Sequence, residues 1–290
     1  MNKYILALLK CKNIGNVKLL KYIQQNSFNH EKIKNNIQTL VSKEDYERIN
    51  EYLRAAEEEI TSNESKGIKL ITILDEKFPK KLYDIKDPVL YLYYIGNINL
   101  INKPSLAIIG SREIEANEKI IAQNQASYFS NQEICIVSGL AIGTDTFAHK
   151  GAIKGNGKTI AILPSGLDNI VPTSNKELAK EILNNNGLLV SEYSIGTKPS
   201  KYTFVKRDRI QSALSDAILV IKASETSGTM HAVKAALESN KYVTQIKGNN
   251  NKHILNNFEI NKDESRLLEI INNTNSSVIE EPIIEQTSLF

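Results

Sequence analysis

Six short apolar runs between residues 106 and 246 constrain the fold most, because helical patterns of about ten to fifteen residues separate them. The runs are 106–109, 134–137, 159–163, 187–190, 217–221 and 242–246. Strands that alternate with helices form βαβ units with parallel strands, and strands that are apolar throughout are buried on both faces. The chain is therefore predicted to form an α/β domain, a parallel sheet with helices on both faces.

The residues before and after these runs differ from them in composition and in the spacing of apolar residues. Segments 68–74 and 89–95 also have strand-like composition. The first sixty or so residues show apolar positions at helical spacing with Gly15 as their sole glycine, and the sequence turns polar after Gly248. We therefore predict three parts: a helical N-terminal domain at 1–65, the sheet domain at 66–248, and a linker with a short tail at 249–290.

Gly15 marks a corner between two helical patterns within residues 13–20. Helix–hairpin–helix modules that hold DNA backbones carry a turn of this kind. A corner inside a small helical packing domain has the same sequence, and a single glycine does not separate the two readings. We favour the packing domain.

Composition bounds the class of protein. The 290 residues include 41% hydrophobic and 24% charged residues, as in soluble globular proteins, and the net charge of +3 permits an anionic partner without requiring one. Two distant cysteines and four scattered histidines favour neither a disulfide framework nor a metal site. We see no secretory signal and no membrane span, so we expect a cytoplasmic protein that binds no metal.

Three of the apolar runs end in glycine-bearing turns that lead into helical patterns: 110–112, 138–143 and 227–229. In a parallel sheet such turns share the edge at the carboxyl ends of the strands, where main-chain N–H groups can face an anion. Arg112 adds a cation that can grip a phosphate. Neither the dinucleotide pattern GxGxxG nor the P-loop pattern GxxxxGK[ST] is present, so we expect no nucleotide cofactor.

The most basic stretch, 198–209, holds five cations and one acid, with Tyr202 and Phe204 among them. Cations that follow a backbone and aromatic rings that stack on bases are the features of single-strand nucleic acid binding. We place this stretch on the loop after strand 187–190, at the same edge as the glycine turns. The sequence therefore predicts a rim for a polymeric phosphate.

Residues Ser138, Asp145 and His149 do not form a catalytic triad in our interpretation. The GxSxG elbow is missing, and residues four apart on one helix do not give a relay geometry. Thr144 and Asp145 stand where a helix cap is needed, and we interpret His149 as a packing residue.

Seven segments in collinear order resemble the DNA-processing protein A family (DprA/Smf). They are FPKKLYDIKDPVLYLYYIGN (78–97), LAIIGSR (106–112), VSGLAIGTDTFAHKGAI (137–153), GKTIAILPSGLDNIVPTSN (157–175), GLLVSEYSIGTKP (187–199), FVKRDRI (204–210) and SGTMHAVKAALESNKYVTQIKG (227–248). The resemblance implies an extended Rossmann-like fold and a homodimer that binds single-stranded DNA without being an enzyme. It further implies protection of incoming DNA and loading of the RecA recombinase during natural transformation.

The same resemblance assigns the DNA contacts by position. The residues that match the family's DNA-binding motifs are Gly110, Ser111, Arg112, Ser138, Gly139, Lys201, Phe204, Arg207 and Arg209. Three departures from the family pattern stand out. Asp208 replaces the asparagine of the Arg-Asn-Arg motif, where it could weaken DNA binding or pair with a neighbouring arginine. Lys247-Gly248 replaces Pro-Gly, and Gln211-Ser212 stands where apolar and small residues are usual. We also find no full winged-helix domain after residue 248.

Two other functions remain open at this point. The turn at 227–229 is similar to one in nucleotide phosphoribohydrolases, although their catalytic glutamate falls on Ala232 and their Gly-Gly pair is absent. A protein-interaction scaffold without DNA binding is the third hypothesis.

Overall fold

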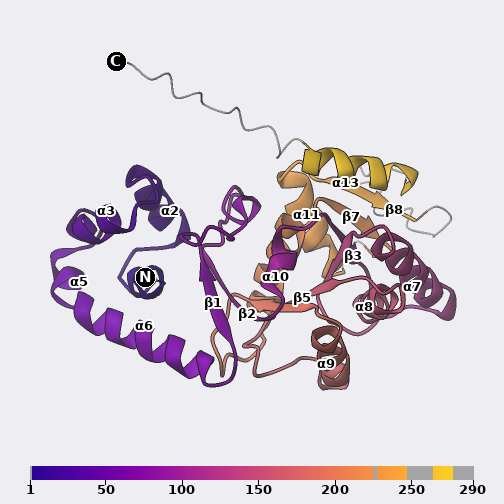
Figure 1. The fold of residues 1–290 in the computed structure, drawn as a ribbon, viewed down its shortest axis with the longest axis horizontal. Coiled ribbons are helices and arrows are strands. Elements are labelled where there is room, and N and C mark those ends of the chain that lie inside the picture. Colours follow the sequence, from indigo (N-terminus) through magenta and orange to yellow (C-terminus); the bar gives the residue numbers. More distant parts are fainter. Residues whose placement is uncertain (1, 225–226, 247–263, 277–290) are drawn as a thin grey trace, which may run out of the picture.

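The structure is a computed structural model that describes residues 2–224, 227–246 and 264–276. Figure 1 shows a group of N-terminal helices beside a large sheet that carries helices on both faces. The N-terminal helices are α1 (Lys3–Leu9), α2 (Asn16–Gln25), α3 (His30–Asn35), α4 (Ile37–Leu40), α5 (Lys43–Glu47) and α6 (Ile49–Glu64).

Local sequence explains where several of these helices begin. The side chains of Asn29 and Ser42 accept hydrogen bonds from main-chain N–H groups in the first turns of α3 and α5. Gly15, in an extended conformation, precedes α2. Apolar side chains of α1 and α2 pack into the same hydrophobic core as one face of the sheet. The corner at Gly15 therefore belongs to helices that are packed against the rest of the molecule.

The sheet has eight strands in the order β1-β2-β6-β5-β4-β3-β7-β8. The strands are β1 (Lys69–Thr72), β2 (Tyr91–Gly96), β3 (Ser105–Ile109), β4 (Cys135–Ser138), β5 (Thr159–Leu163), β6 (Leu188–Ser191), β7 (Ala217–Val220) and β8 (Tyr242–Gln245). The six strands from β3 to β8 are parallel, which confirms the predicted α/β class. The first two strands run antiparallel at one edge, where β2 pairs with β6.

Alternate residues of each central strand face opposite layers of helices. Ala107 and Ile109 pack toward α10 (Lys201–Leu214) and α11 (Thr229–Glu238). Leu106 and Ile108 pack toward α7 (Ala116–Ser130), α8 (Thr144–Lys154) and α13 (Leu267–Ser276). The period of two in a strand produces this division, and all five residues of β3 are buried. A further helix, α9 (Lys176–Asn184), covers β5 and β6.

The order of the strands creates a switch point beside β3. From β3 the chain winds outward through β4, β5 and β6, and α10 then returns it to β7 on the other side of β3. The loops that follow β3, β4 and β7 therefore leave neighbouring strands at the same edge. Ligands of open α/β sheets bind in the crevice at such a point.

The predicted linker and tail lie partly outside the described residues, namely at 249–263 and 277–290. The described part forms a short 3-10 turn (Glu264–Arg266) and α13. Leu267 and Ile271 are fully buried against the α7–α8 face of the sheet. This helix therefore belongs to the packed fold, and the division into three domains stays a prediction.

Among the described residues, no helix is long and apolar enough to cross a membrane. The same residues contain no group of three or more histidine, cysteine, aspartate or glutamate side chains arranged to hold a metal ion. Cys11 and Cys135 are both buried and unpaired.

Candidate nucleic-acid interface

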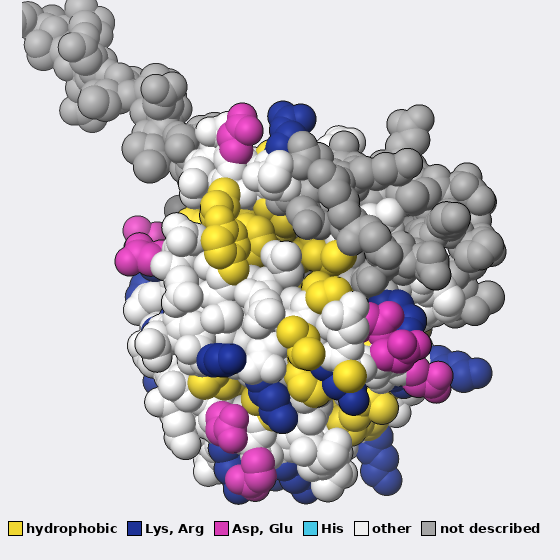
Figure 2. Space-filling view, turned by 90° about the vertical axis from the view of Figure 1, so that its right-hand side faces the viewer, with side chains coloured by type: hydrophobic (Ala, Val, Ile, Leu, Met, Phe, Trp, Pro, Cys, Tyr) yellow, Lys and Arg dark blue, Asp and Glu magenta, His cyan; other side chains and the backbone are white. Residues whose placement is uncertain are grey.

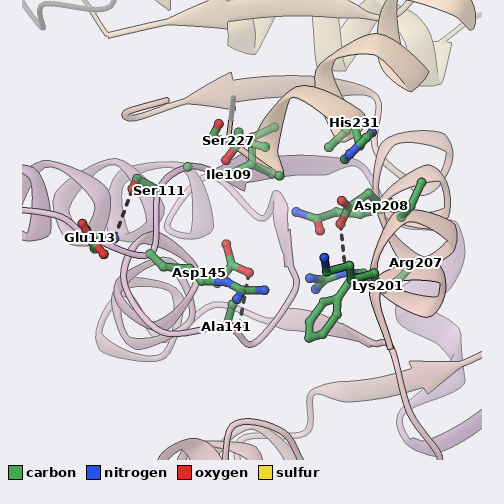
Figure 3. A pocket seen from close by; sticks show the side chains of 18 of the residues that line it. Ile109, Ser111, Glu113, Ala141, Asp145, Lys201, Arg207, Asp208, Ser227 and His231 are labelled. Carbon is green, nitrogen blue, oxygen red and sulfur yellow. Dashed lines mark hydrogen bonds and ion pairs between the residues drawn. The ribbon is translucent and has the colours of Figure 1, made fainter. Parts of the chain in front are cut away.

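A cavity of about 710 Å³ opens at the switch point. Figure 3 shows side chains converging on it from α10 on one side and from the loops after β3 and β4 on the other. The start of α11, with Ser227 and His231, forms a further wall. All three glycine turns of the sequence therefore contribute to one hollow, as their places after β3, β4 and β7 predict.

Hydrogen bonds between the loops fix the shape of this rim. Ser111 donates its N–H to the carbonyl oxygen of Lys222 at 2.7 Å, which ties the β3 loop to the β7 loop. Thr144 donates both its N–H and its hydroxyl to the carbonyl oxygen of Ser111, each at 3.1 Å. Gly143 has a φ of +79°, and a Cβ there would lie 2.4 Å from the carbonyl oxygen of Arg112. Only glycine permits this close approach.

The turn after β4 is occupied by an anion of the protein itself. Oδ2 of Asp145 accepts the N–H groups of Gly139 at 3.1 Å and Ala141 at 3.2 Å. Burial raises the pKa of Asp145, while Arg207 and these N–H donors oppose the rise. The hydroxyl of Ser138 is fully buried and donates to the carbonyl oxygen of Ile108. Ser138 and Gly139 therefore lie beneath the cavity, where the sequence analysis expected contact with phosphate.

Arg207 is a buried side chain that lies directly over Gly139. It is 5% exposed, donates from Nη1 to the carbonyl oxygen of Ile162 at 3.0 Å, and brings Nε within 3.0 Å of Oδ1 of Asp208. A Cβ on residue 139 would lie 1.5 Å from Nη1. The glycine thus creates the space in which the guanidinium rests.

Gly139→Ala is expected to displace Arg207 and to lower the free energy of unfolding by about 1–3 kcal/mol, the usual result of overpacking. Thermal unfolding followed by circular dichroism measures the loss. Gly15→Ala is the control, because a Cβ at Gly15 would meet nothing within 4 Å and the φ of that residue is negative. An equal effect at both positions would contradict the assigned role of Gly139.

From Lys201 on, the basic stretch is a helix and not the loop that the sequence analysis expected, whereas residues 198–200 precede the helix. α10 begins at Lys201 behind a capping box, in which Ser200 and Thr203 exchange hydrogen bonds between side chains and main chain. Helical geometry then directs successive side chains to different surroundings. Lys201 is exposed at the cavity, whereas Phe204 is half-buried with the Cζ atom of Arg112 5.0 Å from its ring centre.

Arg209 points away from the cavity into a cluster of ion pairs. It grips both carboxylate oxygens of Glu192 at 2.7 and 2.8 Å, and its Nε lies 2.7 Å from Oδ2 of Asp87. The side chain is 10% exposed. Arg209 therefore joins α10 to the end of β6 and to the segment before β2, and it does not line the cavity.

Asp208 lines the cavity and pairs with Arg207, which was one of two possibilities open from the sequence. Burial raises the pKa of this carboxyl to about 6, with Asp145 adding to the rise and Arg207 and His231 opposing it. The sequence analysis missed His231 as a cavity residue. The signal was present, because residue 231 falls in the first turn of a helix that follows the 227–229 turn.

His149 is a packing residue, as the sequence analysis interpreted it. It is fully buried, and its Nδ1 lies 2.7 Å from the hydroxyl oxygen of Thr159. That hydroxyl donates to the carbonyl oxygen of Ile136, so Nδ1 is the donor in the contact. Burial lowers the pKa of His149 to about 3, and the ring is neutral.

The model of the family "DNA recombination-mediator protein A" matches residues 69–274. The chain belongs to this family. Its members include the DNA processing protein DprA of Streptococcus pneumoniae, 36% identical over 187 residues that cover 64% of this chain and 66% of the relative. Another is the Bacillus subtilis DprA, 33% identical over 63% of this chain and 61% of the relative. The chain thus spans less than two thirds of the length of these relatives.

Two solved structures of DprA proteins are similar to this fold. The X-ray structure from Streptococcus pneumoniae has a TM-score of 0.69 at 28% identity, covering 96% of this chain and 93% of that one. The Helicobacter pylori structure, whose description concerns a single-stranded DNA binding mode, has a TM-score of 0.62 at 30% identity. It covers 72% of this chain and 96% of that one. The DprA fold therefore accounts for the Rossmann-like sheet of the present structure.

Proposed function

We propose that the chain binds single-stranded DNA at the switch-point cavity and acts as a recombination mediator. The observation that carries the proposal is the meeting of Arg112, Lys201 and Phe204 at one cavity from two distant segments. Cations beside an aromatic ring suit a phosphate backbone with stackable bases. The single-strand binding described for the Helicobacter pylori relative supports the same function.

The proposed contacts divide into two groups by exposure. Gly110, Ser111, Arg112, Lys201 and Phe204 line the cavity with accessible surface, and we assign them to direct contact. The buried set is made up of Ser138, Gly139, Arg207 and Arg209. The first three lie at the rim, where Arg207 borders the cavity, whereas Arg209 joins α10 to Glu192 and Asp87. Little of their surface is accessible, so we propose that these residues position the exposed ones, in place of the direct contact that the motif match implied.

The charges of the cavity balance one another. Arg112, Lys201 and Arg207 face Glu113, Asp145 and Asp208 in its lining. Main-chain N–H groups stabilise the carboxylate of Asp145, and Arg207 pairs with Asp208. Glu113 is the exposed acid of the lining, and its exposed cations are Arg112 and Lys201. Attraction of a phosphate therefore depends on these two side chains.

The wider role is carried over from the family: protection of incoming DNA, loading of RecA during natural transformation, and a homodimer in the cytoplasm. Surface for a partner is available on the face shown in Figure 2, where hydrophobic side chains are spread among neutral polar ones. Helix α7, on this side of the molecule, exposes 57% of Ile120 and 52% of Tyr128. Sedimentation velocity tests the homodimer, and RecA filament assembly on DNA coated by single-strand binding protein tests the loading.

We also propose that the chain is not an enzyme. Ala232 lies in the cavity wall where phosphoribohydrolases carry their catalytic glutamate, and an alanine supplies no acid or base. Incubation of the purified chain with nucleoside monophosphates is expected to release no free base. Release of base would favour the hydrolase instead.

Arg112→Ala combined with Lys201→Ala is expected to weaken single-strand binding about tenfold at 0.15 M salt. It should also reduce the slope of log K against log salt by about 1.4, since each lost phosphate contact contributes about 0.7. Fluorescence anisotropy of a labelled oligothymidylate across a salt series measures both. Arg54→Ala with Lys180→Ala, two exposed residues outside the cavity, is the charge-matched control. Equal affinities of the two double variants would disprove the placement.

A further inference from the structure

A second hollow, of about 620 Å³, lies between α2 and α10. We call it the α2–α10 groove and define it by Lys18 and Lys21 of α2, Tyr202 and Lys206 of α10, and Asp87. The Gly15 corner, which the proposed function does not use, borders it. The groove therefore joins the N-terminal helices to the helix that walls the first cavity.

The charge of this groove is positive, in contrast to the balanced cavity. Three lysines face one acid, Asp87, which is paired with Lys206 and Arg209. Lys18 and Lys21 are exposed and stand three residues apart, on one face of α2. No ion pair of either lysine occurs within the described residues. Both cations are therefore free to meet an anion.

An exposed aromatic ring lies beside these cations. Tyr202 is 66% exposed, although it belongs to a helix that is otherwise packed on the sheet. The Nζ atom of Lys206 lies 5.6 Å from its ring centre. A ring with an open face among lysines matches the stacking platforms of proteins that bind single strands.

Helix α10 contributes side chains to both the cavity and the groove. Lys201, Phe204 and Val205 line the cavity, whereas Tyr202 and Lys206 line the groove. Consecutive residues of an α-helix point about 100° apart, so the two hollows lie on adjacent faces of the same two turns. A chain leaving the cavity reaches the groove by crossing the first turns of α10.

We propose that the α2–α10 groove is a second subsite for single-stranded DNA, which holds the part of the strand that leaves the switch-point cavity. The inference rests on the proposed function and extends it to the N-terminal helices. The lysines bind phosphates, and Tyr202 stacks on a base. The short strand held in the cavity alone does not reach these residues.

The test compares oligothymidylates of increasing length on the full chain. Lys18→Ala with Lys21→Ala is expected to leave the affinity for the shortest binding oligonucleotide unchanged. For a 20-nucleotide strand we expect a loss of about five- to tenfold and a salt slope smaller by about 1.4. Lys32→Ala with Lys34→Ala, which removes two exposed lysines from α3, is the matched control. Equal behaviour of the two variants at every length would overturn the subsite.

A second readout reports contact directly. A long strand with 5-iodouracil at successive positions is expected to crosslink to Tyr202 on irradiation, and peptide mapping locates the adduct. Adducts confined to the switch-point cavity, or a lysine effect seen with duplex DNA alone, would overturn the proposal. Failure of the unsubstituted chain to bind any single strand would instead overturn the proposed function. The two failures are therefore distinguishable.

Discussion

Arg209→Ala is expected to lower the free energy of unfolding by about 3–5 kcal/mol, the typical cost of removing one partner from a buried ion-pair cluster. The guanidinium holds Glu192 through two hydrogen bonds and lies against Asp87, and its removal leaves the carboxylate of Glu192 buried without its cation. Glu192 is itself only 10% exposed. The midpoint of thermal unfolding should fall by roughly 10 °C.

Arg54→Ala is the reference for this experiment, because Arg54 is 81% exposed in an ion pair on the surface of α6. Exposed pairs of this kind contribute less than about 1 kcal/mol. Arg209→Ala should also weaken DNA binding only to the extent that the fold is disturbed. If the variant kept the parent's midpoint of thermal unfolding but lost affinity for DNA, Arg209 would have to be a direct DNA contact.

Asp208→Asn is expected to stabilise the protein above pH 6 and to change little near pH 4. Burial raises the pKa of this carboxyl from 3.8 to about 6. The folded state therefore binds the proton more tightly than the unfolded state, and stability falls as pH rises from about 4 to about 6. At 1.36 kcal/mol for each pKa unit, the loss is about 3 kcal/mol. Asparagine carries no charge and avoids this loss.

The midpoints of thermal unfolding of the parent and of Asp208→Asn, measured from pH 4 to pH 8, test whether the substitution stabilises the protein as pH rises. The difference between the two proteins should widen with pH and level off above pH 7. His231→Gln serves as the control, because His231 lines the same cavity and opposes the rise in the pKa of Asp208. A difference that stays constant across pH would contradict a raised pKa at Asp208.

The sheet was predictable because its signal is local. The run 106–109 is apolar throughout, the run 159–163 is apolar after Thr159, and each lies in a buried strand. The antiparallel pairing of β2 with β6 was not predicted, since direction depends on how residues about one hundred positions apart meet. Local signals were also overlooked: Ser200 with Thr203 is a capping box, and it marks the start of α10.

The position of the candidate site in the fold was predictable, but which of its side chains face solvent was not. Placing glycine turns after neighbouring parallel strands brought Ser111 and Arg112 to the right edge of the sheet. Whether an arginine faces solvent depends on partners elsewhere in the chain. Arg209 is buried because it pairs with Asp87 and Glu192. The Arg-Asp-Arg motif alone does not predict either partner.

The carboxylate of Asp145 has a consequence for how DNA would be released. It already accepts hydrogen bonds from the N–H groups of Gly139 and Ala141. The N–H group of Ser111 is also taken, because it donates to the carbonyl oxygen of Lys222. In the proposed complex, a phosphate would therefore be held mainly by Arg112 and Lys201, whose charges lie at the ends of long, rotatable side chains. Competing ions and other polyelectrolytes readily displace such contacts. Contacts of this kind would suit the proposed role of a mediator that transfers its DNA strand to another protein.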